Sequence, residues 1–199
     1  MRPFGAQTEY AAQAFRGLSH PQEAIGQRAF YECTFEACSF LETAFESCKF
    51  FDCTFRECDL SLIKVKGSAF SNTAFADSKI IGVNWADARW TRFRIANAIS
   101  FERCTLDYST FVGLSLKGIR LVQCSARDVD FAEADLTEAD CSETDFADSR
   151  FLHTNLTRAN FTGATNYAID PGLNVLTQAR FSLPEAIALL RGLDIVLTE

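Results

Sequence analysis

An apolar residue recurs at every fifth position over most of this chain, in two runs separated by a phase slip of one residue within 96–100. A period of five matches neither the 3.6-residue period of a helix nor the two-residue period of a strand. A chain that turns a corner every five residues can point all of these side chains inward. We call this apolar position i, and its members are Phe30, Phe35, Phe40, Phe45, Phe50, Phe55, Leu60, Val65, Phe70, Phe75, Ile80, Trp85, Trp90, Ile95, Phe101, Leu106, Phe111, Leu116, Leu121, Ala126, Phe131, Leu136, Cys141, Phe146, Phe151, Leu156 and Phe161.

A second column of small residues lies two places before the first, while positions i−1, i+1 and i+2 are mostly polar. The pattern predicts that i and i−2 both point into one filled core and that the other three positions form the surface. The residues that define this column are Cys33, Cys38, Thr43, Cys48, Cys53, Cys58, Ala134, Ala139, Thr144, Ser149, Thr154 and Ala159.

The segments Ala134–Glu138 (ADLTE) and Ala159–Gly163 (ANFTG) match the A(D/N)LXX repeat, and through them the chain resembles the pentapeptide-repeat family over residues 28–163. The resemblance implies an all-β, right-handed quadrilateral β-helix in which four pentapeptides make one 20-residue coil. About seven coils, paired at the ~4.8 Å spacing of parallel strands, would form a rod about 33 Å long.

Residues 1–27 follow the period poorly, because His20 and Pro21 interrupt it between Gly17 and Gly26. We expect an irregular first coil that caps the rod, since an open end exposes unpaired backbone and apolar rings.

The phase slip near 96–100 directly follows Trp85 and Trp90, which both stand at position i. Two indoles fit poorly where Phe or Leu is usual, so we expect a bulge or a distorted coil there. Either a recognition feature or a tolerated insertion on a corner would produce it.

Residues 164–199 lose the period and are expected to form a C-terminal cap and dimerisation module. Ser182 and Glu185 have the spacing of a capping box with Pro184 in the first turn, which predicts an α-helix over about 183–191 followed by a short strand at 194–197. Cap alone is the simpler interpretation, and the apolar residues beyond it are a candidate homodimer interface. These residues are Ile187, Leu190, Leu193, Ile195 and Leu197.

Eight cysteines raise the question of a metal site or disulfides. Seven stand at i−2 and Cys141 stands at i, so their spacing is that of the repeat rather than that of a zinc site. Pairs such as Cys38 and Cys58 would stack one coil apart, within the Cα range of a disulfide, but a reducing compartment keeps them as thiols. With no P-loop, GxGxxG, HExxH or GxSxG motif, we expect no catalytic residue, no metal and no cofactor.

The net charge of −7 disfavours direct binding to nucleic acid or to an anionic membrane and favours a basic protein partner. No apolar run approaches the ~18 residues of a membrane span, and the N-terminus lacks an apolar signal region, so we expect a cytoplasmic protein.

The acids are concentrated between residues 128 and 149, where the sequence has nine carboxylates and no base. Four stand at i−1 and the others at i+2, so they should ring about one coil on all four sides. This acidic belt is either a solvated face or a surface that replaces DNA phosphates on a basic protein. Its members are Asp128, Asp130, Glu133, Asp135, Glu138, Asp140, Glu143, Asp145 and Asp148.

Further stretches narrow the resemblance. Residues 99–104, 166–170 and 179–186 look like the albicidin-resistance and microcin B17-immunity branch of the family, and residues 193–197 resemble the end of the Qnr quinolone-resistance proteins. The long loops of Qnr have no counterpart here. The resemblance implies a homodimeric DNA mimic that binds a type II topoisomerase, DNA gyrase or topoisomerase IV, and gives resistance to its poisons. The alternatives are a general protein-interaction scaffold with an unrelated partner and, more remotely, a metal- or redox-responsive protein.

Overall fold

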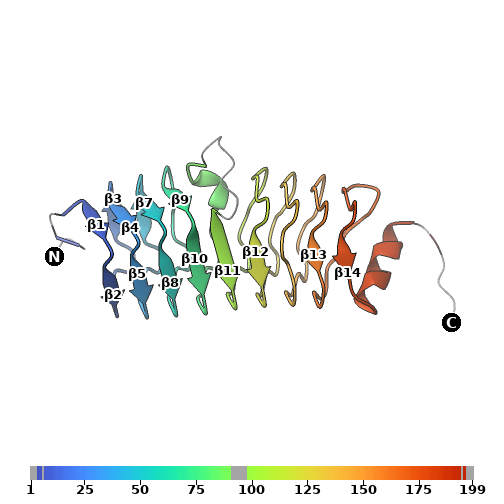
Figure 1. Ribbon diagram of the computed structural model, residues 1–199, viewed down its shortest axis with the longest axis horizontal. Coiled ribbons are helices and arrows are strands. Elements are labelled where there is room, and N and C mark those ends of the chain that lie inside the picture. The colour runs from blue at the N-terminus through green and yellow to red at the C-terminus, as the bar shows by residue number, and fades with distance from the viewer. Residues whose placement is uncertain (1–3, 6, 91–97, 194, 196–199) are drawn as a thin grey trace.

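The chain forms a rod of stacked coils that return to the same side of the rod after 20 residues, with one longer coil in the middle (Figure 1). The computed structural model describes residues 4–5, 7–90, 98–193 and 195. The rod has about eight coils, with the N-terminus at one end and a short helix at the other. This architecture is the β-helix that the period of five predicts.

Short parallel strands and single bridges form the four sides. Strands β1, β4, β7 and β9 pair in that order on the first side, and β2, β5, β8, β10, β11 and β12 pair on the second, which the β13–β14 pair continues. Isolated bridges hold the third side, and the β3–β6 pair and further bridges hold the fourth. The strands are β1 (Glu9–Ala11), β2 (Ala14–Arg16), β3 (Ala24–Gly26), β4 (Ala29–Tyr31), β5 (Thr34–Glu36), β6 (Ala44–Glu46), β7 (Lys49–Phe51), β8 (Thr54–Arg56), β9 (Ala69–Ser71), β10 (Thr73–Ala76), β11 (Ile99–Glu102), β12 (Arg120–Val122), β13 (Asn160–Phe161) and β14 (Arg180–Phe181).

Aromatic rings at position i fill the lumen, as expected. Phe40 and Phe111 are fully buried and Leu136 is 1% exposed. Rings one coil apart lie parallel, as Phe30 and Phe50 do with centroids 5.1 Å apart and planes 6° apart. Rings on neighbouring sides of one coil meet edge to face, as Phe30 and Phe35 do at 74°. Both arrangements are favourable for phenyl quadrupoles, which explains why the chain uses 19 phenylalanines.

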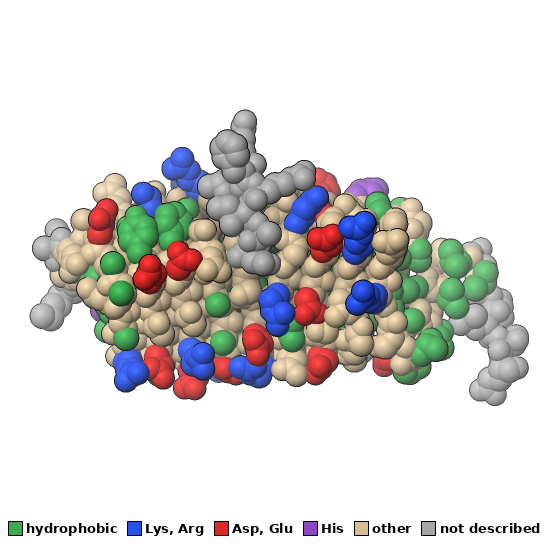
Figure 2. All heavy atoms as spheres, in the orientation of Figure 1, with side chains coloured by type: hydrophobic (Ala, Val, Ile, Leu, Met, Phe, Trp, Pro, Cys, Tyr) green, Lys and Arg blue, Asp and Glu red, His purple; other side chains and the backbone are tan. Residues whose placement is uncertain are grey.

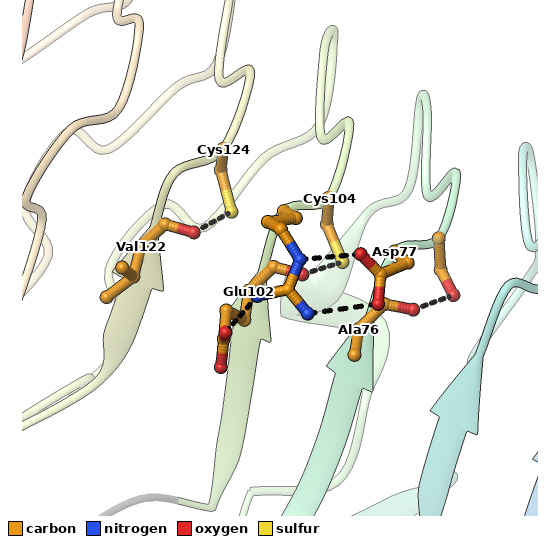
Figure 3. A network of polar contacts seen from close by, with 8 residues as sticks. Ala76, Asp77, Glu102, Cys104, Val122 and Cys124 are labelled. Carbon is orange, nitrogen blue, oxygen red and sulfur yellow. Dashed lines mark hydrogen bonds and ion pairs between the residues drawn. The ribbon is translucent and has the colours of Figure 1, made fainter.

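Side chains at i−2 join neighbouring coils through hydrogen bonds. The Thr144 hydroxyl donates to the Leu121 carbonyl (2.6 Å) and accepts from the Cys124 amide (3.1 Å), so it bridges two otherwise orphaned backbone groups. Cysteines occupy the same column as weaker donors. The Cys53 thiol lies 3.4 Å from the Phe30 carbonyl one coil away, and the thiols of Cys104 and Cys124 lie 3.4 and 3.3 Å from the carbonyls of Glu102 and Val122 in their own coils (Figure 3). All eight cysteines are buried thiols.

The N-terminal segment differs from the expected irregular coil. Tyr10, Phe15 and Ile25 pair in register with Phe30, Phe35 and Phe45, so this part of 1–27 is a regular coil. His20 takes the inward place that Phe40 takes one coil later, and the two rings lie 6.4 Å apart and nearly parallel. An imidazole has the planar shape that the column requires, which a hydrophobicity count does not register.

Phe4 covers the open end of this first coil. Its ring lies 5.2 to 5.7 Å from the rings of Tyr10, Phe15, His20 and Phe30. Among the described residues, the Phe4 ring therefore covers this end of the rod, over a first coil that is regular.

The interruption in the middle of the rod is larger than a slip of one residue. Phe75 pairs with Phe101, a step of 26 residues, so this coil has six extra residues. Counting in steps of five detects only the one residue by which the six extra residues exceed a whole pentapeptide. Ile99 and Ser100 are already in register within β11, so the interruption precedes them; Ile95 lies outside the described residues.

The two tryptophans before the interruption behave differently from each other. Trp85, in the 3₁₀ turn η1 (Trp85–Asp87), is fully buried and lies parallel to the ring of Phe111, with centroids 6.0 Å apart. Trp90 is only partly buried, and its indole N–H donates to the Trp85 carbonyl (2.8 Å). The lumen thus accepts the Trp85 indole completely but not that of Trp90.

The C-terminal helix is a 3₁₀-helix, η2 (Glu185–Leu193), rather than the expected α-helix over 183–191. Among the described residues Ser182 forms no capping-box hydrogen bond; its hydroxyl accepts instead from the amide of Gly163 on the last coils (2.8 Å). The strand expected at 194–197 lies outside the described residues except for Ile195, which is not in a strand.

The ring stacks predict a large cost for removing one ring. Phe131 is fully buried between Phe111 (5.3 Å) and Phe151 (5.2 Å), so Phe131→Ala should lower the free energy of unfolding by about 3–5 kcal/mol, through lost transfer energy and a cavity. Urea denaturation followed by circular dichroism measures this. The control is Phe51→Ala, since Phe51 points outward and is only half-buried; equal losses in the two variants would contradict the packing described.

Candidate interaction surface

The four aspartates at i−1 of the acidic belt are part of the turns that build the coil. Their Oδ1 atoms accept hydrogen bonds from the backbone amide two residues later: Ala132 to Asp130 (2.9 Å), Thr137 to Asp135 (3.2 Å), Ser142 to Asp140 (3.3 Å) and Ala147 to Asp145 (3.1 Å). These Asx turns favour aspartate or asparagine at i−1 for reasons of backbone geometry alone.

Each of the same four aspartates also has a cation from a neighbouring coil, one on each side of the rod. The ion pairs are Arg150–Asp130 (3.1 Å), Lys117–Asp135 (3.3 Å), Arg120–Asp140 (3.5 Å) and Arg127–Asp145 (3.7 Å). On a corner, Arg158 pairs with Glu138 (2.9 Å). Five of the nine carboxylates in the belt therefore have a positive partner.

Asp135 shows how the turn and the ion pair act together. Burial raises the pKa of this carboxyl, but the hydrogen bonds from Thr137 and the nearby Lys117 ammonium outweigh it and hold the pKa below its usual range. The charged form of Asp135 is thus stabilised by the fold.

The remaining four acids lie on the corners between the sides, where the backbone has a positive φ. Asp128, Glu133 and Asp148 form no ion pair within the part of the chain that the structure describes. Glu143 accepts a hydrogen bond from the Gln123 amide (2.8 Å). These corner carboxylates are the part of the belt that no cation of the described residues pairs with.

The cations that neutralise the belt lie outside residues 128–149 in the sequence. Lys117, Arg120 and Arg127 come from the preceding coil, and Arg150 and Arg158 from the following one. A count of charge along the linear sequence misses these cations. Aligning the residues by the 20-residue period would have placed each cation close to its carboxylate.

Charge is mixed on the rest of the rod as well. On the face in Figure 2, Asp and Glu side chains alternate with Lys and Arg along one edge of the rod. Arg16 pairs with Glu36 (2.7 Å), and Arg103 pairs with Asp77 (2.6 Å) and with Glu102 (Figure 3). The Asp77–Arg103 pair connects the coils on either side of the interruption, and the arginine holds the pKa of Asp77 below its usual range.

The C-terminal module both covers the rod and leaves apolar surface free. Ala188 and Leu189 pack against the core together with Leu176 and Phe181. Hydrophobic side chains also gather on the surface at this end (Figure 2). Of the candidate interface residues, Ile187 is 47% exposed, Leu193 and Ile195 are exposed to a similar extent, Leu190 is half-buried and Leu197 lies outside the described residues.

A recess of about 620 Å³ separates η2 from the last coils. It is lined by apolar side chains such as Ile187 and by charges of both signs, Arg127 and Arg191 with Asp148 and Glu185. The recess therefore combines apolar surface with charges of both signs at the C-terminal end of the rod.

The described residues offer no group of three or more His, Cys, Asp or Glu side chains placed to hold a metal ion. Burial raises the pKa of Cys53 and Cys124 to about 12, so these thiols are protonated at neutral pH. Within the same residues, no helix is long and apolar enough to cross a membrane.

Comparison with known families and structures agrees with this architecture. A model described as "Pentapeptide repeat region" matches residues 28–111, and one described as "Pentapeptide repeats (8 copies)" matches residues 124–163. Together they cover more than half of the chain, which therefore belongs to the pentapeptide-repeat family. No protein with a curated function matches it in sequence.

Two solved structures share the fold at low sequence identity. A trypsin-treated variant of QnrB1, described as a plasmid-mediated fluoroquinolone resistance protein, has 18% identity and a TM-score of 0.58, with 92% of this chain and 99% of that chain covered. HetL from the cyanobacterium Nostoc sp. strain PCC 7120, described as involved in heterocyst differentiation regulation, has 11% identity and a TM-score of 0.54, with 87% and 89% covered.

The pairing of Asp135 predicts a pH-dependent contribution to stability. Because the folded pKa is lowered, the contribution is present above the pKa of the unfolded chain (about 3.9) and is lost as pH falls through the folded value. Asp135→Asn keeps the Asx turn, as Asn155 does with Thr157, and should cost up to about 1 kcal/mol at pH 7 and less at pH 3. Urea unfolding at both pH values measures this; a cost that does not shrink at low pH, or an equal cost for the unpaired Asp128→Asn, would contradict it.

Proposed function

We propose that this protein is a non-enzymatic, homodimeric DNA mimic that binds a type II topoisomerase and gives resistance or immunity to agents that poison it. The observation that carries the proposal is a rigid rod whose lumen is filled by side chains and whose unpaired carboxylates stand outward on its corners. The resemblance of residues 166–170 and 179–186 to the albicidin-resistance and microcin-immunity branch supports the same partner.

Charge density sets how far the mimicry can extend. Nine carboxylates and five paired cations leave four negative charges over the three coils of the belt and its neighbours, or about 14 Å of rod. That is roughly one charge per 3.6 Å, about half the density of B-DNA at one per ~1.7 Å. The belt is therefore a local mimic, and shape and non-ionic contacts must contribute to binding.

A fold shared with a fluoroquinolone resistance protein is consistent with a topoisomerase partner, but the same fold also occurs in HetL, described as acting in heterocyst differentiation. This second neighbour favours the alternative function, a general protein-interaction scaffold with an unrelated partner. The two functions differ in whether gyrase responds to the protein.

The exposed apolar residues of the C-terminal module and its recess of mixed charge support the proposed dimerisation through this module. In a two-fold dimer the exposed side of η2 would face the same helix of the partner, and the two rods would point away from each other. A dimer would double the number of carboxylate corners available to one enzyme.

The first prediction concerns gyrase activity. The purified protein should inhibit DNA supercoiling by gyrase at micromolar concentration and reduce the cleavage complexes that a fluoroquinolone stabilises. The triple variant Asp128→Asn, Glu133→Gln, Glu143→Gln should inhibit several-fold less, because charged contacts at an interface accelerate association.

The matched control neutralises two corner acids in the other half of the rod, Glu32→Gln and Glu57→Gln, which share the positive φ of the tested positions. If the wild type leaves both supercoiling and drug-stabilised cleavage unchanged, the scaffold function is the better description. If the control loses as much inhibition as the triple variant, the belt has no special role.

The second prediction concerns oligomeric state. Ile187→Asp places a charge on the exposed side of η2 and should shift the protein from dimer to monomer in sedimentation velocity, at unchanged circular dichroism. Leu62→Asp, on a distant and equally exposed residue, is the control and should leave the dimer intact. A monomeric wild type, or a dimeric Ile187→Asp variant, would show that the interface is wrongly placed.

A further inference from the structure

Two bulky apolar side chains stand at corner positions that polar residues mostly occupy. At each corner residue φ is between about 48° and 70°, a region that L residues other than Gly, Asn and Asp enter at a steric cost. Of the 25 non-glycine residues with positive φ among those the structure describes, only Phe4, Leu62 and Tyr108 have large apolar side chains. Phe4 covers the end of the rod, whereas Leu62 and Tyr108 lie on a corner along its length.

Leu62 and Tyr108 lie on the same corner of the rod. The 20-residue period, with the 26-residue step across the interruption, aligns Gln22, Glu42, Leu62, Gly82, Tyr108, Asp128 and Asp148 in one row. We call this row the Leu62 corner. A single residue, Gly82, separates the two apolar side chains, which are thus about two coils apart, or roughly 10 Å.

Both side chains face solvent. Tyr108 is 67% exposed and Leu62 is 48% exposed. Leu62 lies over Gly82, where an added Cβ would come within 2.7 Å of its Cδ2 atom, so the glycine makes room for the leucine. Half-buried Ile81 lies next to this pair on the third side and extends the apolar surface.

Carboxylates flank this apolar surface at both ends. Glu42 precedes Leu62, and its carboxylate accepts a hydrogen bond from the Gln22 amide (3.2 Å). Asp128 and Asp148 follow Tyr108, and neither has an ion-pair partner in the described part of the chain. The row itself contains no base.

A recess of about 340 Å³ opens beside Leu62, with Ile63 and Gly82 among its lining residues. Glu42 and Asp87 add two carboxylates to its lining, and Lys64 adds one ammonium. The recess can accept a side chain from the surface that covers Leu62.

We propose that the Leu62 corner is a docking ridge that inserts Leu62 and Tyr108 into an apolar groove on a protein partner whose rims carry Lys and Arg. Tyrosine on a rigid backbone is a residue type that often dominates binding energy, and the flanking carboxylates orient the ridge against the cationic rims. Energetically disfavoured backbone positions that hold exposed apolar residues are expected where function, rather than folding, determines the residue. The partner is the topoisomerase of the proposed function, on which this assignment rests.

The experiment replaces each apolar residue with one that its backbone prefers. Asparagine tolerates a positive φ better than leucine or tyrosine, so Leu62→Asn and Tyr108→Asn should keep or raise the thermal midpoint. Each should nevertheless raise the concentration that half-inhibits the gyrase holoenzyme in the supercoiling assay by at least about tenfold. Weaker inhibition at an unchanged or higher thermal midpoint distinguishes a docking role from a structural one.

Val112→Asn is the matched control, since Val112 is an exposed apolar residue close in sequence on a different side of the rod. It should leave the half-inhibitory concentration within about twofold of the wild-type value.

The outcomes are distinguishable. If the wild type inhibits gyrase and both asparagine variants inhibit equally well, the ridge assignment is overturned and the proposed function stands. If the wild type does not affect gyrase, the proposed function fails and this assignment fails with it. If sedimentation velocity shows that the variants lose a dimer instead, the ridge joins two copies of this chain and the assignment to a different protein is wrong.

Discussion

Parallel stacking of aromatic rings at the coil spacing is the constraint on which this structure depends. A phenyl ring packs against its equivalent one coil later at about 5 Å, as in Phe35–Phe55 and Phe55–Phe75, which is close to the separation of parallel strands. Because the backbone ladder and the ring stack require nearly the same repeat distance, each coil fits directly onto the preceding one. Strands of only two to four residues are then sufficient for the walls, since the lumen rather than the sheet supplies the burial.

Because the lumen supplies the burial, the outward positions have only a few structural roles. Aspartate at i−1 closes an Asx turn, and cations such as Arg150 and Lys117 come within reach from adjacent coils. A surface that looks strongly acidic along the sequence is consequently a lattice of paired charges in three dimensions. The features that remain unexplained by the fold are the unpaired corner acids and the apolar corner residues, and these are where an external partner is expected to bind.

The sequence predicted the core of this fold and much less of its details. The period of five identified the inward residues, and the resemblance supplied the four-sided coil that places Phe30 over Phe50. The period did not reveal that His20 continues an aromatic column, because shape and not hydropathy decides that position. The period also showed only one of the six extra residues of the interruption, because an insertion of five residues leaves the phase unchanged. It missed the cations that pair with the belt, because they are distant in sequence. The capping box expected at Ser182 is not formed, and the Ser182 hydroxyl instead accepts a hydrogen bond from the distant Gly163 amide, a tertiary contact that local spacing does not reveal.

The 26-residue step has a consequence for how such a rod can change during evolution. Phe101 returns to the side of Phe75, so the six extra residues leave the angular orientation of all later coils unchanged. A net gain or loss of one pentapeptide in the wall would instead rotate everything downstream by a quarter turn and break every surface row at that point. Duplications of whole coils, or excursions that rejoin the wall where they left it, are therefore the length changes that such a protein can tolerate while keeping a continuous face toward its partner.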